Sequence, residues 1–355
     1  MKIIIPLVGS FGKSGGFRVL SQLANHWIKD GHEVCFLSYI NTDDPYFPTK
    51  AEILYYDNSG EIKEAKDQQH PKAILGMFSM RNALKKALNK LEADVVLASH
   101  CFTALPVKKS SIKAKKFYYV QAYEPDFFYH KTVKNFIYKK ISKNSYLLGL
   151  NIIVNASMYQ DYEEIKTNRV VFPGLDLSVF KPVEVQKNNE KIILGTIGRL
   201  EEYKGTKYII EAFKDLRKKL GDKIELHVAF GEPSFEEIDG IKVVVPNGDL
   251  ELAKYYNSLD IYICAGTIQL DAIHYPIIES MACKVPVITT GYYPSNNNNA
   301  TIIPIKDSEA IEKVVSAFVI NKDVFFNKTN HATKDVEQFS WSLIAKKMMD
   351  YFKAI

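Results

Sequence analysis

The chain has 355 residues, of which 46% are hydrophobic, and a formal net charge of +5. A chain of this length suits two domains with cores of ordinary size. No apolar stretch reaches the roughly 18 residues of a membrane span, and the N-terminal apolar run is too short for a secretory signal, so we expect a cytoplasmic protein.

The chain opens with a β-branched run at residues 2–8, then a glycine loop, then apolar residues at helical spacing from Phe17 to Ile28. The loop contains GKS, but a P-loop requires a glycine five positions before Gly12, where Leu7 stands. The spacing of its glycines also differs from a dinucleotide fingerprint. A strand, a loop and a helix start can hold an anion on free amides. Alternatively, Gly15 and Gly16 only permit a tight turn.

Strand-like and helical segments alternate through the first half of the chain. Strands are expected at residues 2–8, 33–39, 94–99, 116–121, 149–154 and 169–172, with helices between them such as 73–91. A segment with two prolines and a polar tail follows, and we interpret residues 173–190 as a linker. The alternation predicts a Rossmann-like domain with a parallel sheet over residues 1–172.

Alternation resumes after the linker and predicts a second Rossmann-like domain over residues 191–335. Its expected strands are 191–198, 223–230, 241–247, 260–266 and 285–290, with helices over 205–220, 250–259 and 276–283. The asparagine run 296–299 is a loop by composition. A last helix within residues 336–355 carries Trp341, Ile344, Met348 and Phe352 on one apolar face, which must pack on another element.

Charge is concentrated between His100 and Lys143, where ten lysines stand against Glu124 and Asp126. Within this stretch, residues 131–143 place Val133, Phe136 and Ile137 on one helical face, surrounded by lysines. Such a helix can lie on an anionic membrane surface. Equally, its apolar face can join the domain core. Nucleic acid is not expected as a partner, because no recognition motif is present.

Two segments of the second half carry charged groups at strand ends. In GTIGRLEEYKG, a strand ends at Gly198, and the loop presents Arg199 and Lys204 before a helix. Two cations beside a helix N-terminus suit a diphosphate, although they can instead pair with neighbouring glutamates.

In LDAIHYPIIESMACKVPVITT, Asp271 precedes Glu279 by eight positions. Pro276 suits the first turn of a helix, which places Glu279 one turn further on. Two acids at this spacing are usually surface charges, but here both stand among apolar residues. Such carboxylates can hold sugar and ribose hydroxyls.

These segments resemble the GT-B retaining glycosyltransferases of family 4 (glycosyl transferases group 1), and the resemblance runs nearly end to end. It includes the glycine loop, VFPGLDLSVFKP, GTIGRLEEYKG, the acid-x7-Glu segment and the closing EQFSWSLIAKKMMDYF. It implies two Rossmann-like domains facing a central cleft, with the last helix packing on the N-terminal acceptor domain. It further implies transfer of a sugar, with retention, from a nucleotide-sugar to a glycan or lipid-linked acceptor in cell-surface polysaccharide or glycoconjugate synthesis.

The resemblance also implies roles for individual residues. Gly15 and Gly16 would contact the donor phosphate, Arg199 and Lys204 the diphosphate, Glu279 the ribose, and Asp271 the donor sugar. Further candidates for donor binding adjoin these segments: Gly198, Asn247, His274, Tyr275 and Ile278. The family usually has glutamate in place of Asp271, and a glycine-rich turn where this chain has Ala272-Ile273-His274.

In the N-terminal domain, His100 and Glu124 follow strand ends and are candidates to contact donor sugar or acceptor. A histidine at a strand end is also often structural. No metal motif such as HExxH is present, so we expect neither a metal nor a cofactor. Two alternative functions are a nucleotide-sugar epimerase of the same fold and a non-catalytic sugar-binding protein at the membrane surface.

Overall fold

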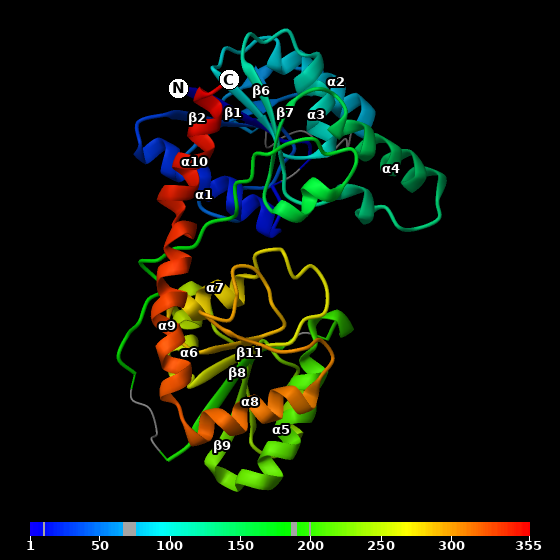
Figure 1. Ribbon diagram of the computed structural model, residues 1–355. Helices are drawn as coiled ribbons and strands as arrows, with labels where there is room; N and C mark the ends of the chain where they lie inside the picture. Colours follow the sequence, from blue (N-terminus) through cyan, green and yellow to red (C-terminus); the bar gives the residue numbers. More distant parts are fainter. Residues whose placement is uncertain (10, 67–75, 186–189, 199) are drawn as a thin grey trace. The chain divides into compact units, whose positions relative to one another are not determined.

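The computed structural model describes residues 1–9, 11–66, 76–185, 190–198 and 200–355. It divides the chain into two compact units (Figure 1). Unit 1 comprises Met1–Gly174 together with Trp341–Ile355, and unit 2 comprises Leu175–Ser340. The chain therefore leaves unit 1, forms the whole of unit 2, and returns to complete unit 1.

The described residues of unit 1 form a seven-stranded sheet in the order β4-β3-β2-β1-β5-β6-β7. Its strands are β1 (Lys2–Pro6), β2 (Glu33–Tyr39), β3 (Glu52–Tyr56), β4 (Ile62–Lys63), β5 (Val95–Ala98), β6 (Lys115–Val120) and β7 (Asn151–Val154). All neighbouring pairs are parallel except β3 with β4. The central strands are buried on both faces, which explains why they are continuous apolar runs in the sequence.

One face of this sheet is covered by α1 (Gly15–Lys29) and α10 (Trp341–Lys353), from opposite ends of the chain (blue and red in Figure 1). The indole N–H of Trp27 donates to the carbonyl oxygen of Ala345 at 3.1 Å, and the Trp27 and Phe352 rings pack at 5.6 Å. Every apolar residue expected on the last helix is buried here. Helix α10 is therefore part of the unit 1 core.

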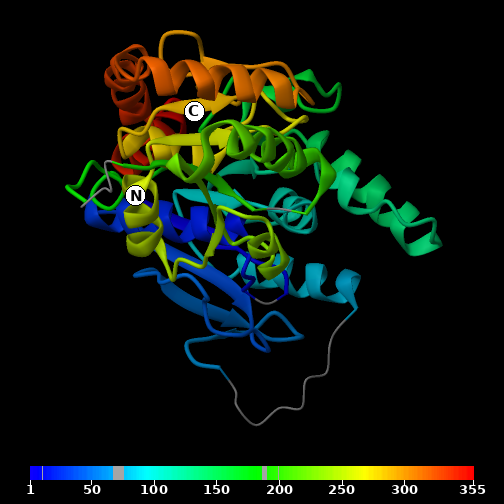
Figure 2. The same ribbon diagram turned by 90° about the horizontal axis from the view of Figure 1, so that it is seen from below.

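The opposite face carries α2 (Met77–Leu88), α3 (Cys101–Lys109) and α4 (Val133–Tyr146), with α3 packed on both α2 and α4. Figures 1 and 2 both show α4 projecting from unit 1. Its buried side is formed by Ser142, Ser145 and Tyr146. Val133 is 79% exposed and Phe136 71%, so these apolar side chains do not join the core.

The described residues of unit 2 form a six-stranded, wholly parallel sheet in the order β10-β9-β8-β11-β12-β13. Its strands are β8 (Ile192–Ile197), β9 (Ile224–Ala229), β10 (Ile241–Val244), β11 (Ile261–Cys264), β12 (Val287–Thr289) and β13 (Thr301–Ile302). Helices α5 (Thr206–Leu220) and α8 (Ser308–Ile320) share one core with this sheet. The remaining helices are α6 (Asp249–Ser258), α7 (Tyr275–Ala282) and α9 (Asp323–Val336).

The α/β fold class with two parallel-sheet domains is thus confirmed, and several details differ. Residues 169–172 form no strand, because only Val170 makes an isolated bridge, to Val154. Of the expected linker 173–190, the described residues from Leu175 onward belong to unit 2. There the Leu175 N–H donates to the Phe339 carbonyl at 2.7 Å, and the Val183 N–H donates to Asn257 Oδ1 at 2.9 Å. Among the described residues, no helix has the length and apolar character needed to cross a bilayer.

Candidate active site

Three of the expected site residues meet in one cavity of unit 1. Gly16, His100 and Glu124 all line a hollow of about 260 Å³ beside the carboxyl ends of β1, β5 and β6. Gly15 and Gly16 are the first two residues of α1, whose N-cap, Ser14, makes no side-chain cap hydrogen bond. Ligands of parallel α/β sheets bind at this edge, so the placement is the one that a substrate site requires.

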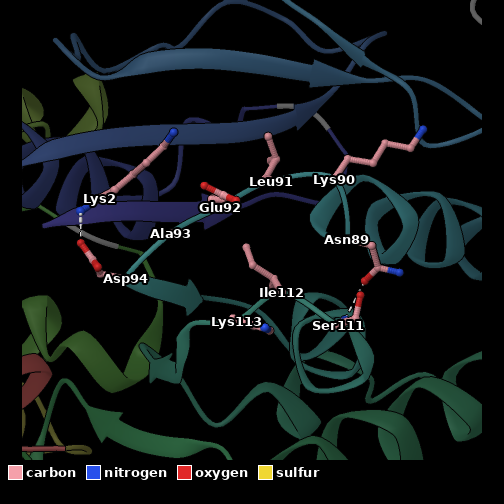
Figure 3. Close-up of a pocket in the computed structure, with 10 residues that line it drawn as sticks. All are labelled: Lys2, Asn89, Lys90, Leu91, Glu92, Ala93, Asp94, Ser111, Ile112 and Lys113. Carbon is pink, nitrogen blue, oxygen red and sulfur yellow. Dashed lines mark hydrogen bonds between the residues drawn. The ribbon is translucent and has the colours of Figure 1, made fainter.

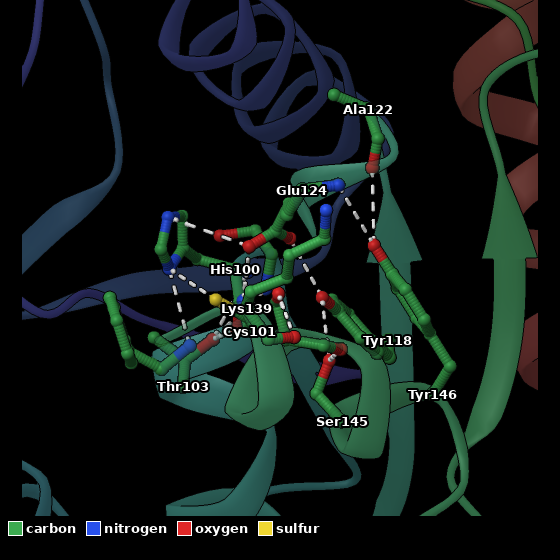
Figure 4. A network of polar contacts seen from close by, with 12 residues as sticks. His100, Cys101, Thr103, Tyr118, Ala122, Glu124, Lys139, Ser145 and Tyr146 are labelled. Atoms are coloured by element: carbon green, nitrogen blue, oxygen red, sulfur yellow. Dashed lines mark hydrogen bonds and ion pairs between the residues drawn. The ribbon is translucent and has the colours of Figure 1, made fainter. Parts of the chain in front are cut away.

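Glu124 is the centre of a buried hydrogen-bond network (Figure 4). One carboxylate oxygen accepts from the Cys101 N–H at 2.7 Å, and the other accepts from the Tyr118 hydroxyl at 2.7 Å. The Glu124 N–H donates to the Tyr146 hydroxyl at 3.0 Å. Burial and the nearby Glu124 carboxylate keep the pKa of Tyr118 well above its ordinary value, so this hydroxyl stays a donor. The network fixes the carboxylate in position.

His100 is the N-cap of α3 and is also held at both ring nitrogens. Its Nδ1 accepts from the Phe102 N–H at 3.2 Å, so the proton of the neutral ring is on Nε2. That Nε2 lies 3.5 Å from Glu124 Oε2. The side chain is 44% exposed. His100 thus serves as a helix cap and still presents an oriented imidazole to the cavity.

Ligand atoms of His100, Cys101 and Glu124 lie within 4.8 Å of one another, which is close enough for one metal ion to bind all three. Whether they can bind one depends on the chemistry of these donor atoms. The Glu124 oxygens and His100 Nδ1 already have the protein partners given above, and Cys101 Sγ lies 3.6 Å from His100 Nδ1. Burial, followed by the Glu124 charge, raises the pKa of the Cys101 thiol well above its ordinary value. A metal ligand must be a thiolate, so this set fits a hydrogen-bond network better than a metal centre.

Gln121, at the end of the predicted strand 116–121, lines the same cavity and was not among the expected site residues. Its Oε1 is buried and has no hydrogen-bond partner among the described residues. Its side-chain amide lies against Gly16, where an added Cβ would stand 3.3 Å from Nε2. A buried polar atom without a partner is costly, which makes Gln121 a further candidate for substrate contact.

A larger hollow of about 650 Å³ lies at the opposite end of this sheet (Figure 3). Lys2 and Asp94, at the amino ends of β1 and β5, line it, and the Lys2 N–H donates to Asp94 Oδ2 at 2.7 Å. None of the expected site residues lines it. Because ligands bind at the carboxyl edge of parallel sheets, its size alone does not make it a substrate site.

In unit 2, the expected diphosphate loop is shaped by two glycines. A Cβ on Gly205, which has a φ of 75°, would stand 1.8 Å from the Ala265 carbonyl oxygen, so the loop lies directly on the end of β11. A Cβ on Gly198 would stand 2.5 Å from Gly231 Cα. Lys204 is half-buried, and the N-cap of α5 is Gly205, which has no side chain to cap the first turn. Arg199 lies outside the described residues.

Glu279 occupies the expected place, one turn into α7 after Pro276, and is 3% exposed. The sequence suggests no partner for this charge, but the structure supplies one. The Tyr256 hydroxyl of α6 donates to Glu279 Oε2 at 2.8 Å. Burial, followed by the Glu279 charge, holds the pKa of Tyr256 well above its ordinary value.

The residues before Glu279 have contrasting surroundings. Asp271 is exposed in a turn, although its neighbours in the sequence are apolar. His274 stacks on Tyr292 with ring centroids 4.5 Å apart, and its Nδ1 lies 3.7 Å from Cys264 Sγ.

The other expected donor-binding residues lie at nearby helix starts. Tyr275 is the half-buried first residue of α7, and Ile278 is fully buried in that helix. Asn247 is exposed, and its N–H donates to Glu251 Oε2 at 2.7 Å.

Comparisons with known proteins bear on the family and the fold. Residues 191–321 match the family model "Glycosyl transferases group 1". The chain is 22% identical, over the full length of both proteins, to an uncharacterized glycosyltransferase of Haemophilus influenzae. Among solved structures, sucrose-phosphate synthase of Thermosynechococcus elongatus superposes with a TM-score of 0.69 at 14% identity, covering 100% of this chain and 98% of that one.

A further neighbour is HepE of Anabaena in complex with UDP-glucose, with a TM-score of 0.67 at 13% identity and full coverage of both chains. Likeness at these identities shows the fold, and the family model identifies the module in unit 2. Residues 191–321 therefore belong to the group 1 glycosyl transferases, and the chain as a whole has the GT-B fold.

Proposed function

We propose that the protein transfers a sugar from a nucleotide-diphosphate sugar to a glycan or lipid-linked acceptor, with retention of anomeric configuration and without a metal. The observation that carries the proposal is the arrangement in unit 2. Buried Glu279 is fixed by Tyr256, and Lys204 precedes an uncapped helix start within the module that matches the family model. The complex of HepE with UDP-glucose supports a nucleotide-sugar as donor.

In this proposal, each group stabilises a particular part of the donor. Lys204 and the first turn of α5 stabilise the charge that develops on the leaving diphosphate. Glu279 accepts hydrogen bonds from the ribose hydroxyls, and Asp271 faces the donor sugar. In unit 1, His100 and Gln121 would contact hydroxyls of the acceptor at the cavity, while Glu124 keeps the imidazole oriented.

The donor is tested by thermal shift with UDP, GDP, dTDP and ADP, because a ligand that binds only the folded protein raises its unfolding midpoint. Lys204→Ala and Glu279→Gln should each weaken binding of the stabilising nucleotide by roughly tenfold to a hundredfold, since each removes a charge-assisted interaction. Glu279→Gln keeps an acceptor for Tyr256, so its fold should survive. Unchanged binding in both variants contradicts the site.

Incubation with a panel of nucleotide-sugars separates transfer from the two alternatives. Hydrolysis or transfer of the donor sugar supports the glycosyltransferase. Interconversion of donors supports an epimerase, and nucleotide-sugar binding without any reaction supports a binding protein.

We further propose that the acceptor is reached at an anionic membrane surface, through α4. Its apolar side chains are exposed between four exposed lysines: Lys131, Lys134, Lys139 and Lys140. The other lysines of the basic stretch contribute less, because several are engaged within unit 1. For example, Lys115 donates to the Phe352 carbonyl at 2.9 Å and Lys143 pairs with Glu164 at 2.8 Å. Exposed apolar groups ringed by lysines are typical of helices at lipid interfaces.

Vesicle co-sedimentation tests this surface. Binding to phosphatidylglycerol vesicles should exceed binding to phosphatidylcholine vesicles, and it should fall as salt rises. Charge reversal of Lys134, Lys139 and Lys140 to glutamate should abolish it. The matched control reverses Lys29, Lys50 and Lys63, which are exposed elsewhere in unit 1. Equal loss in both triple variants shows that net charge, rather than α4, is responsible.

A further inference from the structure

Arg81, on α2, is a buried cation for which the described part of the chain supplies no anionic partner. The residue is 8% exposed, and no hydrogen bond or ion pair of its guanidinium is found among the described residues. Its Nε is buried and has no acceptor. A buried charge is normally paired, because removing it from water costs several kcal/mol. The position of Arg81 therefore requires an explanation that the proposed glycosyl transfer does not supply.

Two aromatic rings hold the guanidinium in place. Its central carbon lies 6.0 Å from the ring centroid of Phe78 and 5.9 Å from that of Phe102. Cation–π contacts of this kind attract the positive charge, but they leave the in-plane N–H donors of arginine without acceptors. The aromatic rings thus orient Arg81 and leave its hydrogen bonds to be made by something else.

Arg81 borders a cavity of about 230 Å³ between α2 and α3. Its lining includes two further cations, Lys85 and Lys109, and the amide of Asn82, and no acidic side chain of the described residues lines it. The described lining residues are Phe78, Arg81, Asn82, Lys85, Leu105, Pro106 and Lys109. Three like charges around one small cavity repel one another. An anion in the cavity would convert this repulsion into attraction.

We propose that this cavity binds a phosphate group, as a monoester or diester. The planar fork of arginine matches two phosphate oxygens, and lysines act on the same group as point charges. The volume is sufficient for one phosphate with part of the group that it esterifies, since a water molecule takes about 30 Å³ in the liquid. The apolar walls from Phe78, Leu105 and Pro106 suit the organic part of such an ester.

The phosphate can come from a lipid headgroup or from a soluble phosphate ester. The site is coupled to the proposed membrane surface through Phe102, whose ring lies 5.0 Å from that of Tyr138 on α4. The same ring lies 5.2 Å from the ring of His100 in the unit 1 cavity. A ligand in the site would thus act on the Phe102 ring, which contacts both Tyr138 on α4 and His100 in the unit 1 cavity.

The test uses the full chain and follows tryptophan fluorescence, because both tryptophans, Trp27 and Trp341, belong to unit 1. Inorganic phosphate should raise the unfolding midpoint of unit 1 above its value in chloride at equal ionic strength. Arg81→Met should weaken phosphate binding by about tenfold to a hundredfold, since it removes charge-assisted hydrogen bonds. The control is Lys86→Met, which removes the same charge from an exposed position of the same helix outside the cavity.

Two further measurements complete the test. Without phosphate, Arg81→Met should unfold at the same temperature as the wild type or higher, because it removes an unpaired buried charge. If that variant does not fold, Lys85→Met with Lys109→Met should show the same loss of phosphate response. The proposal is overturned if phosphate raises the midpoint equally in the cavity variant and in Lys86→Met, or in neither.

Vesicles identify the source of the phosphate. If Arg81→Met lowers binding to phosphatidylglycerol vesicles while Lys86→Met does not, the ligand is a lipid headgroup. If Arg81→Met weakens the response to inorganic phosphate but leaves vesicle binding unchanged, the ligand is a soluble phosphate ester. UDP binding in unit 2 should be unchanged in both variants, so a failure at this site is distinguishable from a failure of the proposed donor site.

Discussion

Glu225 offers a quantitative test of the electrostatics of unit 2. It is 6% exposed on β9 and accepts from Lys191, just before β8, and from Lys242 on β10 at 2.8 Å. His227 Nε2 lies 3.2 Å from its carboxylate. Burial alone raises the pKa of Glu225, but these three neighbours outweigh it and lower the pKa from 4.5 to about 2.

A folded-state pKa below the unfolded one stabilises the fold above the unfolded pKa, and this stabilisation is lost as pH falls toward the folded pKa. A difference from 4.5 to about 2 corresponds to about 3 kcal/mol at pH 7. By the same relation, the stabilisation from ionised Glu225 falls to about 1.5 kcal/mol at pH 3. Glu225→Gln should therefore lower the free energy of unfolding of unit 2 by these amounts. Lys191 and Lys242 are 36% and 58% exposed, so water can hydrate them in the variant.

Urea denaturation followed by far-UV circular dichroism and by tryptophan fluorescence measures this effect. Fluorescence reports unit 1 alone, because both tryptophans belong to it. The dichroism transition of unit 2 should shift in Glu225→Gln, and the fluorescence transition should not. A wild-type-minus-variant difference that is the same at pH 7 and pH 3 would refute the electrostatic reasoning.

Three further predictions concern single features of the two units. Gly205→Ala should lower the unfolding midpoint of unit 2 far more than Gly221→Ala, because both have positive φ but an added Cβ meets the Ala265 backbone only at Gly205; circular dichroism melting measures both. Truncation after Ser340 should leave unit 1 unfolded or aggregated, since it removes five large buried side chains worth about 1.5–3 kcal/mol each. Soluble yield and Trp27 fluorescence check this, and a soluble, active truncation contradicts it. Gln121→Met should leave the fluorescence midpoint unchanged or raised while sugar transfer falls by about tenfold, because the native amide has a buried atom without a partner; a lowered midpoint would indicate a structural role.

Much of the fold can be read from the sequence because strands buried on both faces are continuous apolar runs. β2 has its predicted bounds of 33–39, and α5 and α7 begin within one residue of prediction. The bounds of α3 were not predicted, because Pro106 lies inside it and because its N-cap is His100 in place of the usual Ser, Thr, Asp or Asn. β3 lies near the edge of the sheet and is only partly buried, so its sequence lacks the apolar run of a central strand.

In the candidate site, too, some contacts could be predicted from the sequence and others could not. Gly16, His100 and Glu124 could be brought together by reasoning, because they follow strands whose carboxyl ends share one sheet edge. The partners of Glu279 and Arg81 could not be predicted in this way. Tyr256 comes from another helix than Glu279, and the rings around Arg81 come from both α2 and α3. Such contacts depend on how helices pack, and a single sequence does not encode helix packing in any local pattern.

The two faces of the unit 1 sheet differ in how freely they can be changed. The face covered by α1 and α10 is closed, because Trp27, Trp341 and Phe352 are buried in one core there. The face of α2, α3 and α4 holds a buried arginine whose Nε has no acceptor among the described residues, and it also carries the exposed apolar side chains of α4. Both features cost stability unless a ligand covers them. The proposed phosphate group and lipid surface would satisfy both with one kind of partner, so the vesicle experiments on α4 and on Arg81 test the same face of unit 1.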